Sequence, residues 1–295
     1  MNELYHYTDS SGLLGILKNK SLWLTNILFM NDSSEFDDGK AVIYREIENR
    51  IEQIKIHPIP TPSDYSLGKL NQEAIIKYLN DLKMYLANSN HPDFDARNYL
   101  FILSFSRSKD LLSQWRAYCR NGGYSIEFNS DRFRNLINKH HEQMMLADCI
   151  YTSQEKTLAA KQAINEALEA FLKLVCTTGT MKEMSNNIHE AHIEQNRKLI
   201  VLAARFKHHG FHEENEVRLI SNGYRNEWLS HRSSSNIIVP YLDIPIELNI
   251  INEVMVSPSN RSNKASASLS TFLSQLGLYK KIKISVSDST YIQNE

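Results

Sequence analysis

The feature that most constrains the fold is the segment at residues 99–106, where hydrophobic side chains follow one another almost without interruption. A short apolar run that does not alternate is typical of a strand that is buried on both faces. Such a strand has to lie inside a sheet that other elements cover on both sides. We therefore expect residues 99–106 to form a strand that is buried on both faces, and 295 residues are enough for a large buried core.

Shorter strand and helix patterns surround this central segment. Residues 3–8 carry alternating aromatic and β-branched side chains, which predicts a strand, and the residues from Asp9 can cap a helix that continues to Leu17. We expect an α+β fold, since strands and helices do not alternate regularly. Further strands are predicted at residues 21–25, 124–128, 144–151, 216–220, 237–240, 249–256 and 282–287, and further helices up to about residue 55, around Trp115 and at residues 69–87 and 264–277.

Two long amphipathic patterns stand apart from the strands. Residues 155–175 and about 180–205 have the apolar spacing of helices, and they lie between two predicted strands. We interpret them as a helical insertion at about residues 153–206 of a single domain that spans residues 1–295.

Composition and charge exclude several classes of protein. The formal charge of −1 gives no general attraction to nucleic acid. Cys119, Cys149 and Cys176 stand far apart and form no C-x-x-C pair, which favours a reducing compartment over a disulfide framework. No N-terminal signal and no apolar run of roughly 18 residues is present. We therefore expect a cytoplasmic protein that does not contact a membrane.

Pairs of polar side chains occur on two of the predicted strands. Residues i and i+2 of a strand share a face, so His6 points the same way as Thr8, and Ser104 the same way as Ser106. An imidazole beside a hydroxyl can bind a sugar diol, and two hydroxyls at the end of an apolar strand suit the floor of a pocket. The alternatives are a core histidine beside a strand-forming threonine, and a strand that frays into a loop.

A third polar pair precedes an arginine. If residues 214–218 are extended, Glu214, Glu216 and Arg218 share one face. Two neighbouring carboxylates repel unless a cation screens them, and Arg218 can be that cation. A carboxylate at a strand edge can bind a ribose hydroxyl and stabilise an oxocarbenium-like transition state. The alternative is a solvated, charged strand edge.

Other polar and aromatic groups are weaker candidates. We interpret Asn31, Asp32 and Glu35 as a helix-capping arrangement. Three aromatic residues are candidates for stacking on a flat ring, and core packing is their alternative role: Trp23, Trp115 and Tyr118. The histidines at 208, 209 and 212 lack a known metal-site spacing, so we expect no metal.

Taken in chain order, His6-x-Thr8, Ser104-x-Ser106 and Glu214-x-Glu216 resemble the motifs of the ADP-ribosyltransferase superfamily. The chain also resembles a widespread bacterial family of unknown function that opens Leu4-Tyr5-His6-Tyr7-Thr8. That resemblance spans residues 3–220 and includes residues 22–26, 31–36, 104–106, 115 and 214–218. It implies an α+β fold with a split β-sheet core, flanking helices and a long helical insertion.

The resemblance to transferases with a histidine on the first strand implies NAD as the substrate. It would place His6 on the adenosine ribose of NAD, the Tyr7 backbone on the nicotinamide amide, and Thr8 on a ribose or amide group. Ser104 and Ser106 would shape the nicotinamide pocket.

The same resemblance implies roles for the residues nearer the C-terminus. Glu216 would be the catalytic glutamate that binds the nicotinamide ribose, and Glu214 a second acid that orients the acceptor. Arg218 and Trp115 complete the set of residues that we expect to bind NAD.

The activity that the resemblance implies is cleavage of the nicotinamide–ribose bond, with transfer of ADP-ribose to a macromolecular acceptor. Protein and nucleic-acid acceptors both stay open, as does a role as a bacterial toxin or phage-defence effector with an antitoxin or immunity partner. One alternative is a non-catalytic nucleotide-binding module. Another is a metal-dependent nuclease, for which a phosphate clamp is available after the central strand: Arg107, Lys109, Arg116 and Arg120.

Overall fold

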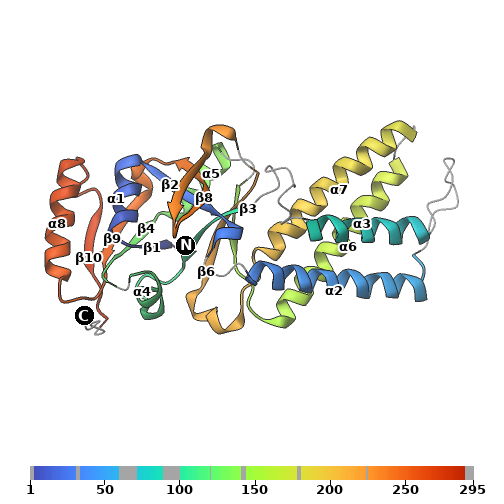
Figure 1. Cartoon of the computed structure of the whole chain (residues 1–295), viewed down its shortest axis with the longest axis horizontal. Helices are drawn as coiled ribbons and strands as arrows, with labels where there is room; N and C mark the ends of the chain where they lie inside the picture. The colour runs from blue at the N-terminus through green and yellow to red at the C-terminus, as the bar shows by residue number, and fades with distance from the viewer. Residues whose placement is uncertain are drawn as a thin grey trace. The chain divides into compact units, whose positions relative to one another are not determined.

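We describe a computed structural model of the chain that covers residues 3–30, 34–59, 72–88, 100–119, 121–140, 144–177, 181–223 and 225–289 (Figure 1). The chain divides into two compact units. The first comprises Met1–Phe29, Leu100–Cys149 and Gly210–Glu295, and the second comprises Met30–Tyr99 and Ile150–His209. The strands lie in the first unit and the long helices in the second.

The first unit contains a mixed sheet of ten strands among the described residues. The strand order is β10-β9-β4-β1-β3-β2-β8-β7, with β6 also paired to β3 and β5 paired to β6. Only β9 and β10 pair in parallel among these strands. The strands are β1 (Leu4–Thr8), β2 (Ser21–Asn26), β3 (Leu100–Ser106), β4 (Tyr124–Phe128), β5 (Met144–Asp148), β6 (Glu216–Asn222), β7 (Leu229–Ser234), β8 (Ile237–Pro245), β9 (Ile251–Val256) and β10 (Lys283–Val286).

Helices flank this sheet, and α8 packs against β10 at one edge (Figure 1). This arrangement confirms the prediction of a fold that mixes helices and strands. A fold similar to that of the ADP-ribosyltransferases stays a prediction. The helices of the first unit are α1 (Ser10–Asn19), α4 (Leu112–Tyr118), α5 (Ser130–His140) and α8 (Ser262–Gln275), with 3-10 turns η1 (Ile27–Phe29), η3 (His209–Glu214), η4 (Asn226–Trp228) and η5 (Leu248–Ile250).

Strand β3 is the buried strand that the apolar run predicts, and its two edges are used differently. One edge pairs with β6 along its whole length, from Leu100 to Ser106. The other edge pairs with β2 at Phe101 and Ile102, and with β1 at Ser106. Residues 103–105 have no strand partner on that edge, so the sheet is split between β1 and β2.

Aromatic side chains fill the core beside this split. The Phe105 ring meets the rings of Phe128 and Phe133 edge-on, with centroids 5.7 Å and 5.4 Å away. Phe133 comes from α5, a helix that our sequence prediction omits. Its residues are mostly charged or polar, and it buries only a narrow stripe that includes Phe133 and Ile137.

The second unit packs four described helices alongside one another (Figure 1): α2 (Ser34–Ile56), α3 (Gln72–Asn88), α6 (Ser153–Thr177) and α7 (Met181–Ala203). Helices α6 and α7 lie where the two long helices are predicted, and they form one compact unit with α2 and α3, while the single domain with a helical insertion stays a prediction. Tyr78 lies within this unit, where it stacks on Phe171 with centroids 4.2 Å apart and donates a hydrogen bond to the Ala167 carbonyl at 3.0 Å.

Gly39 allows α2 and α7 to approach closely. A Cβ atom at Gly39 would lie 2.5 Å from the Ala203 carbonyl oxygen, which is backbone and cannot rotate away. We expect Gly39→Ala to lower the free energy of unfolding by about 1–3 kcal/mol, although alanine is the better helix former. Urea denaturation measures this change. Gly15→Ala in α1 is the control, because no atom lies within 4 Å of its new Cβ, and it should be neutral or slightly stabilising.

Some sequence predictions differ from the structure or fall outside it. Strand β7 is not predicted, because its LSHRSS sequence is polar and partly exposed. The strand predicted at 144–151 ends at Asp148, after which Ile150 forms only an isolated bridge to Phe206. Other predictions concern residues outside the described ranges: Tyr99 at the start of the predicted central strand, the cap at Asn31 and Asp32, the start of the helix at residues 69–71, and Arg120.

Candidate ligand site in the split of the sheet

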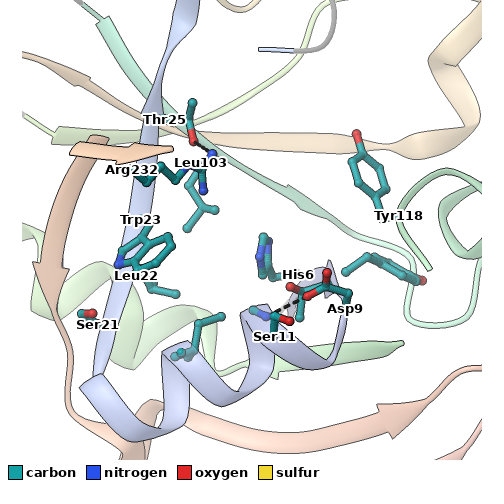
Figure 2. Close-up of a pocket in the computed structure, with 15 residues that line it drawn as sticks. His6, Asp9, Ser11, Ser21, Leu22, Trp23, Thr25, Leu103, Tyr118 and Arg232 are labelled. Atoms are coloured by element: carbon teal, nitrogen blue, oxygen red, sulfur yellow. Dashed lines mark hydrogen bonds between the residues drawn. The ribbon is translucent and has the colours of Figure 1, made fainter. Parts of the chain in front are cut away.

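A pocket of about 490 Å³ lies at the split between β1 and β2. This volume falls within the range of small-molecule sites, on the order of 300–1,000 Å³. Figure 2 shows His6 near its middle, with Trp23, Thr25 and Arg232 on one side and Asp9 and Tyr118 on the other. The residues that line it come from β1, α1, β2, β3, α4 and β7.

His6 binds the edge of β3 that the split leaves open. Its Nδ1 lies 3.0 Å from the carbonyl oxygen of Ser104, a residue without a strand partner on that edge. A carbonyl only accepts, so Nδ1 carries the hydrogen. Burial lowers the pKa of His6 below its ordinary value, while the hydrogen bond to Ser104 acts in the opposite direction. A neutral His6 therefore keeps Nε2 as an acceptor, which suits a ligand hydroxyl.

The lowered pKa of His6 predicts a dependence of stability on pH. As the pH falls below about 6.5, the unfolded chain binds a proton that folded His6 does not bind, so the free energy of unfolding decreases. Protonation of this one histidine changes the free energy of unfolding by at most about 1.4 kcal/mol per pH unit. Urea denaturation between pH 7.5 and 5.5 should give a smaller slope for His6→Asn than for the wild type. His231→Asn, at an exposed position of β7, should keep the wild-type slope, and equal slopes for all three proteins would contradict the prediction.

The first turn of α1 forms one side of the pocket. Asp9 is the N-cap of α1, and its side chain accepts a hydrogen bond from the Gly12 amide at 2.8 Å. A Cβ at Gly12 would lie 2.0 Å from Oγ1 of Thr8. Glycine at this position therefore leaves room for the Thr8 hydroxyl, which lines the pocket as the sequence predicts.

Glu216 and Arg218 form a buried ion pair that Ser104 joins. The Arg218 Nε donates to Oε1 of Glu216 at 2.7 Å, and the Ser104 hydroxyl donates to the same oxygen at 2.6 Å. The two charged residues are only 5% and 4% exposed. Arg218 thus neutralises Glu216, and Ser104 connects this pair to His6 through its carbonyl.

Strand register puts this ion pair on the same sheet face as one wall of the pocket. Directly opposed residues of antiparallel strands share a face. Thr25 opposes Ile102, Ser104 opposes Arg218, and Ser106 opposes Glu216. Thr25 therefore projects from the same face as Ser104 and Glu216. None of Ser104, Ser106, Glu216 and Arg218 is among the residues that line the pocket.

Glu214 does not share the face of Glu216 in the way that an extended chain predicts. Glu214 ends the 3-10 turn η3, and Asn215 adopts a left-handed φ of 43°, so the strand alternation starts only at Glu216. The Ser106 hydroxyl donates to the Glu214 carbonyl at 2.7 Å. Ser106 thus fixes the turn before β6 rather than the floor of the pocket.

The structure places Trp115 in the core and not among the residues that line the pocket. This residue is 2% exposed and packs edge-on against Tyr7, with centroids 4.7 Å apart. The Tyr7 hydroxyl donates to the Ser108 carbonyl at 2.8 Å, so this hydroxyl is bound within the protein. Tyr7, Trp23 and Tyr118 are the large aromatic residues that line the pocket.

Two of the basic residues after β3 form salt bridges with acidic side chains. Arg107 binds Asp148 at 2.7 Å, and Lys109 binds Glu253 at 2.7 Å. These pairs do not form the phosphate clamp that the sequence suggests as an alternative. Within the described ranges, no group of three His, Cys, Asp or Glu side chains is arranged to hold a metal ion.

Two charged residues that line the pocket, Arg232 and Asp9, are not predicted as site residues from the sequence. Arg232 lies on the unpredicted strand β7, and Asp9 appears only as a helix cap in the sequence pattern. An arginine in a polar strand gives no periodic signal, so only the pairing of β7 with β8 and of β8 with β2 brings Arg232 to the pocket.

Comparisons with known proteins give one match. No curated protein and no solved structure matches the chain. Of the described helices, none combines the length and hydrophobicity needed to cross a membrane. A family model described as protein of unknown function (DUF2971) matches residues 114–219. The matched stretch contains Trp115, Glu214, Glu216 and Arg218 but not His6 or Ser104, and over this stretch the chain is similar to that family.

Proposed function

We propose that the chain is an NAD-dependent ADP-ribosyltransferase that binds NAD in the pocket at the split of the sheet. The observation that carries the proposal is the pair of hydrogen bonds at Ser104. Its carbonyl accepts from His6 at 3.0 Å, and its hydroxyl donates to Glu216 at 2.6 Å. Three motifs far apart in the sequence thus meet at one residue beside a pocket.

In the proposed reaction the bond between nicotinamide and the ribose breaks, and nicotinamide leaves with the bonding electron pair. Positive charge develops on the ribose, and the Glu216 carboxylate stabilises it. A nucleophile of the acceptor, or water, then bonds to the anomeric carbon and releases its proton to solvent, while Glu214 is our candidate for the acid that orients the acceptor. Protein and nucleic-acid acceptors are both compatible with this chemistry.

Burial of Glu216 favours a second candidate function. Glu216 is paired with Arg218 and does not line the pocket. A pocket that binds a nucleotide without acting on it would need no free carboxylate. The second candidate is therefore a non-catalytic nucleotide-binding module that uses His6, Thr8 and the other lining residues.

The fate of bound NAD distinguishes the two functions. The purified full chain is titrated with NAD, with Trp fluorescence as the readout of binding because Trp23 lines the pocket. The mixture is then incubated with cell-lysate fractions and analysed for nicotinamide. A transferase gives binding followed by nicotinamide release, whereas a binding module returns intact NAD. A chain that neither binds nor consumes NAD would contradict both candidates.

A further inference from the structure

We infer that Arg232 is the anion-binding residue of the split pocket, and that it holds the phosphate groups of a nucleotide whose sugar hydroxyls face His6 and Asp9. This inference rests on the proposed function and names the chemical class and the orientation of its ligand. No sequence motif marks Arg232, which reaches the pocket from β7 (Figure 2).

The Arg232 guanidinium is fixed in place by neutral groups. Its Nη2 donates to the Thr25 hydroxyl at 3.1 Å. Its central carbon lies 5.7 Å from the centroid of the Trp23 ring and 5.9 Å from that of Tyr241. Cation–π contacts of this kind orient an arginine without neutralising its charge.

No described carboxylate forms a salt bridge with Arg232. The nearby Asp243 accepts a hydrogen bond from the Trp23 indole at 3.1 Å instead. The Arg232 Nε is buried and has no hydrogen-bond partner within the described part of the chain. A partly desolvated guanidinium without a counter-charge is suited to a phosphate, because its planar fork matches the phosphate oxygens.

Asp9 gives the pocket an opposite charge at its other side. A helix N-terminus attracts anions, but the exposed Asp9 carboxylate already caps the N-terminus of α1 and repels a phosphate there. A carboxylate and the Nε2 acceptor of neutral His6 both accept hydrogen bonds from hydroxyls. The charges therefore orient a nucleotide with its phosphates beside Arg232 and its sugar towards α1.

The test compares ligands with and without phosphate. ADP-ribose and adenosine are titrated into the full-length wild type, Arg232→Gln and Arg232→Lys, with tryptophan fluorescence or calorimetry as the readout. We expect Arg232→Gln to weaken ADP-ribose binding by roughly 10- to 100-fold, the range for hydrogen bonds to charged groups, and to change adenosine binding by less than about twofold. Arg232→Lys should retain part of the affinity. Added salt should weaken ADP-ribose binding to the wild type more than to Arg232→Gln.

Arg225→Gln is the matched control. Arg225 also stacks on a tryptophan, with its central carbon 4.9 Å from the Trp228 centroid, but it does not line the pocket. This variant should bind both ligands like the wild type. Thermal unfolding of each variant verifies that it is folded.

The outcomes separate this inference from the proposed function. Unchanged ADP-ribose affinity in Arg232→Gln, an equal loss for adenosine, or no ADP-ribose binding by the wild type would overturn the inference. If ADP-ribose binding depends on Arg232 but NAD is never cleaved, the result supports the anion site and contradicts the proposed transferase activity. If NAD is cleaved and Arg232→Gln leaves the KM for NAD unchanged, the result supports the proposed transferase activity and contradicts the anion site.

Discussion

Glu216→Gln will slow nicotinamide release from NAD by about 100- to 1,000-fold, the cost of removing one group that stabilises transition-state charge, while the Kd for NAD changes by less than about threefold. Glutamine keeps the size of the side chain and an oxygen that can accept from Ser104, but it has no negative charge for the developing ribose cation. The effect should therefore appear in kcat and not in binding.

The control for this variant is Glu227→Gln. Glu227 lies in η4 with 67% of its side chain exposed, and it should have wild-type kinetics. Because Glu216→Gln removes the carboxylate that forms a buried ion pair with Arg218, the assay is run well below the midpoint of thermal unfolding of the variant. Equal rates for Glu216→Gln and the wild type would remove Glu216 from the chemistry and leave the binding module as the better account.

Arg218→Met will lower the free energy of unfolding by about 3–5 kcal/mol, the range for breaking a buried ion pair. The Glu216 carboxylate is 5% exposed, so without Arg218 it would stay buried and lose the ion pair that Arg218 forms with it. Methionine roughly preserves the length of the arginine stem, so the loss reports mainly on the uncompensated charge.

A double-mutant cycle measures the coupling between the two residues. The double variant Glu216→Gln with Arg218→Met has no buried carboxylate to leave unpaired, so it should be less destabilised than the sum of the single variants. Urea denaturation of the wild type and the three variants gives the coupling free energy. Additive effects, or a loss below about 1 kcal/mol in Arg218→Met, would mean that the ion pair does not stabilise the buried Glu216.

The sequence predicts the parts of the site that follow a strand period. The apolar run at residues 99–106 predicts β3, and the i, i+2 alternation places His6 with Thr8 and Glu216 with Arg218 on shared faces. Both pairs are on strands in the structure. The ion pair between Arg218 and Glu216 agrees with the expectation that Arg218 screens a carboxylate.

Other parts depend on contacts that no local pattern encodes. The left-handed Asn215 removes Glu214 from the face of Glu216, and sequence alternation alone gives no sign of that φ value. Trp115 packs against Tyr7 in the core, and its sequence context alone does not distinguish this packing from stacking on a ligand. Arg232 reaches the pocket only because β7 and β8 extend the sheet beyond β2, a pairing set by residues far apart in the chain.

The most direct test of the central claim follows both halves of NAD. The full chain is incubated with lysate fractions and NAD that is isotopically labelled in its adenosine, and released nicotinamide is measured together with label on macromolecules. We predict equimolar nicotinamide release and label transfer by the wild type, and neither above background by Glu216→Gln. NAD recovered intact from the wild type with every fraction would contradict the assignment as an ADP-ribosyltransferase.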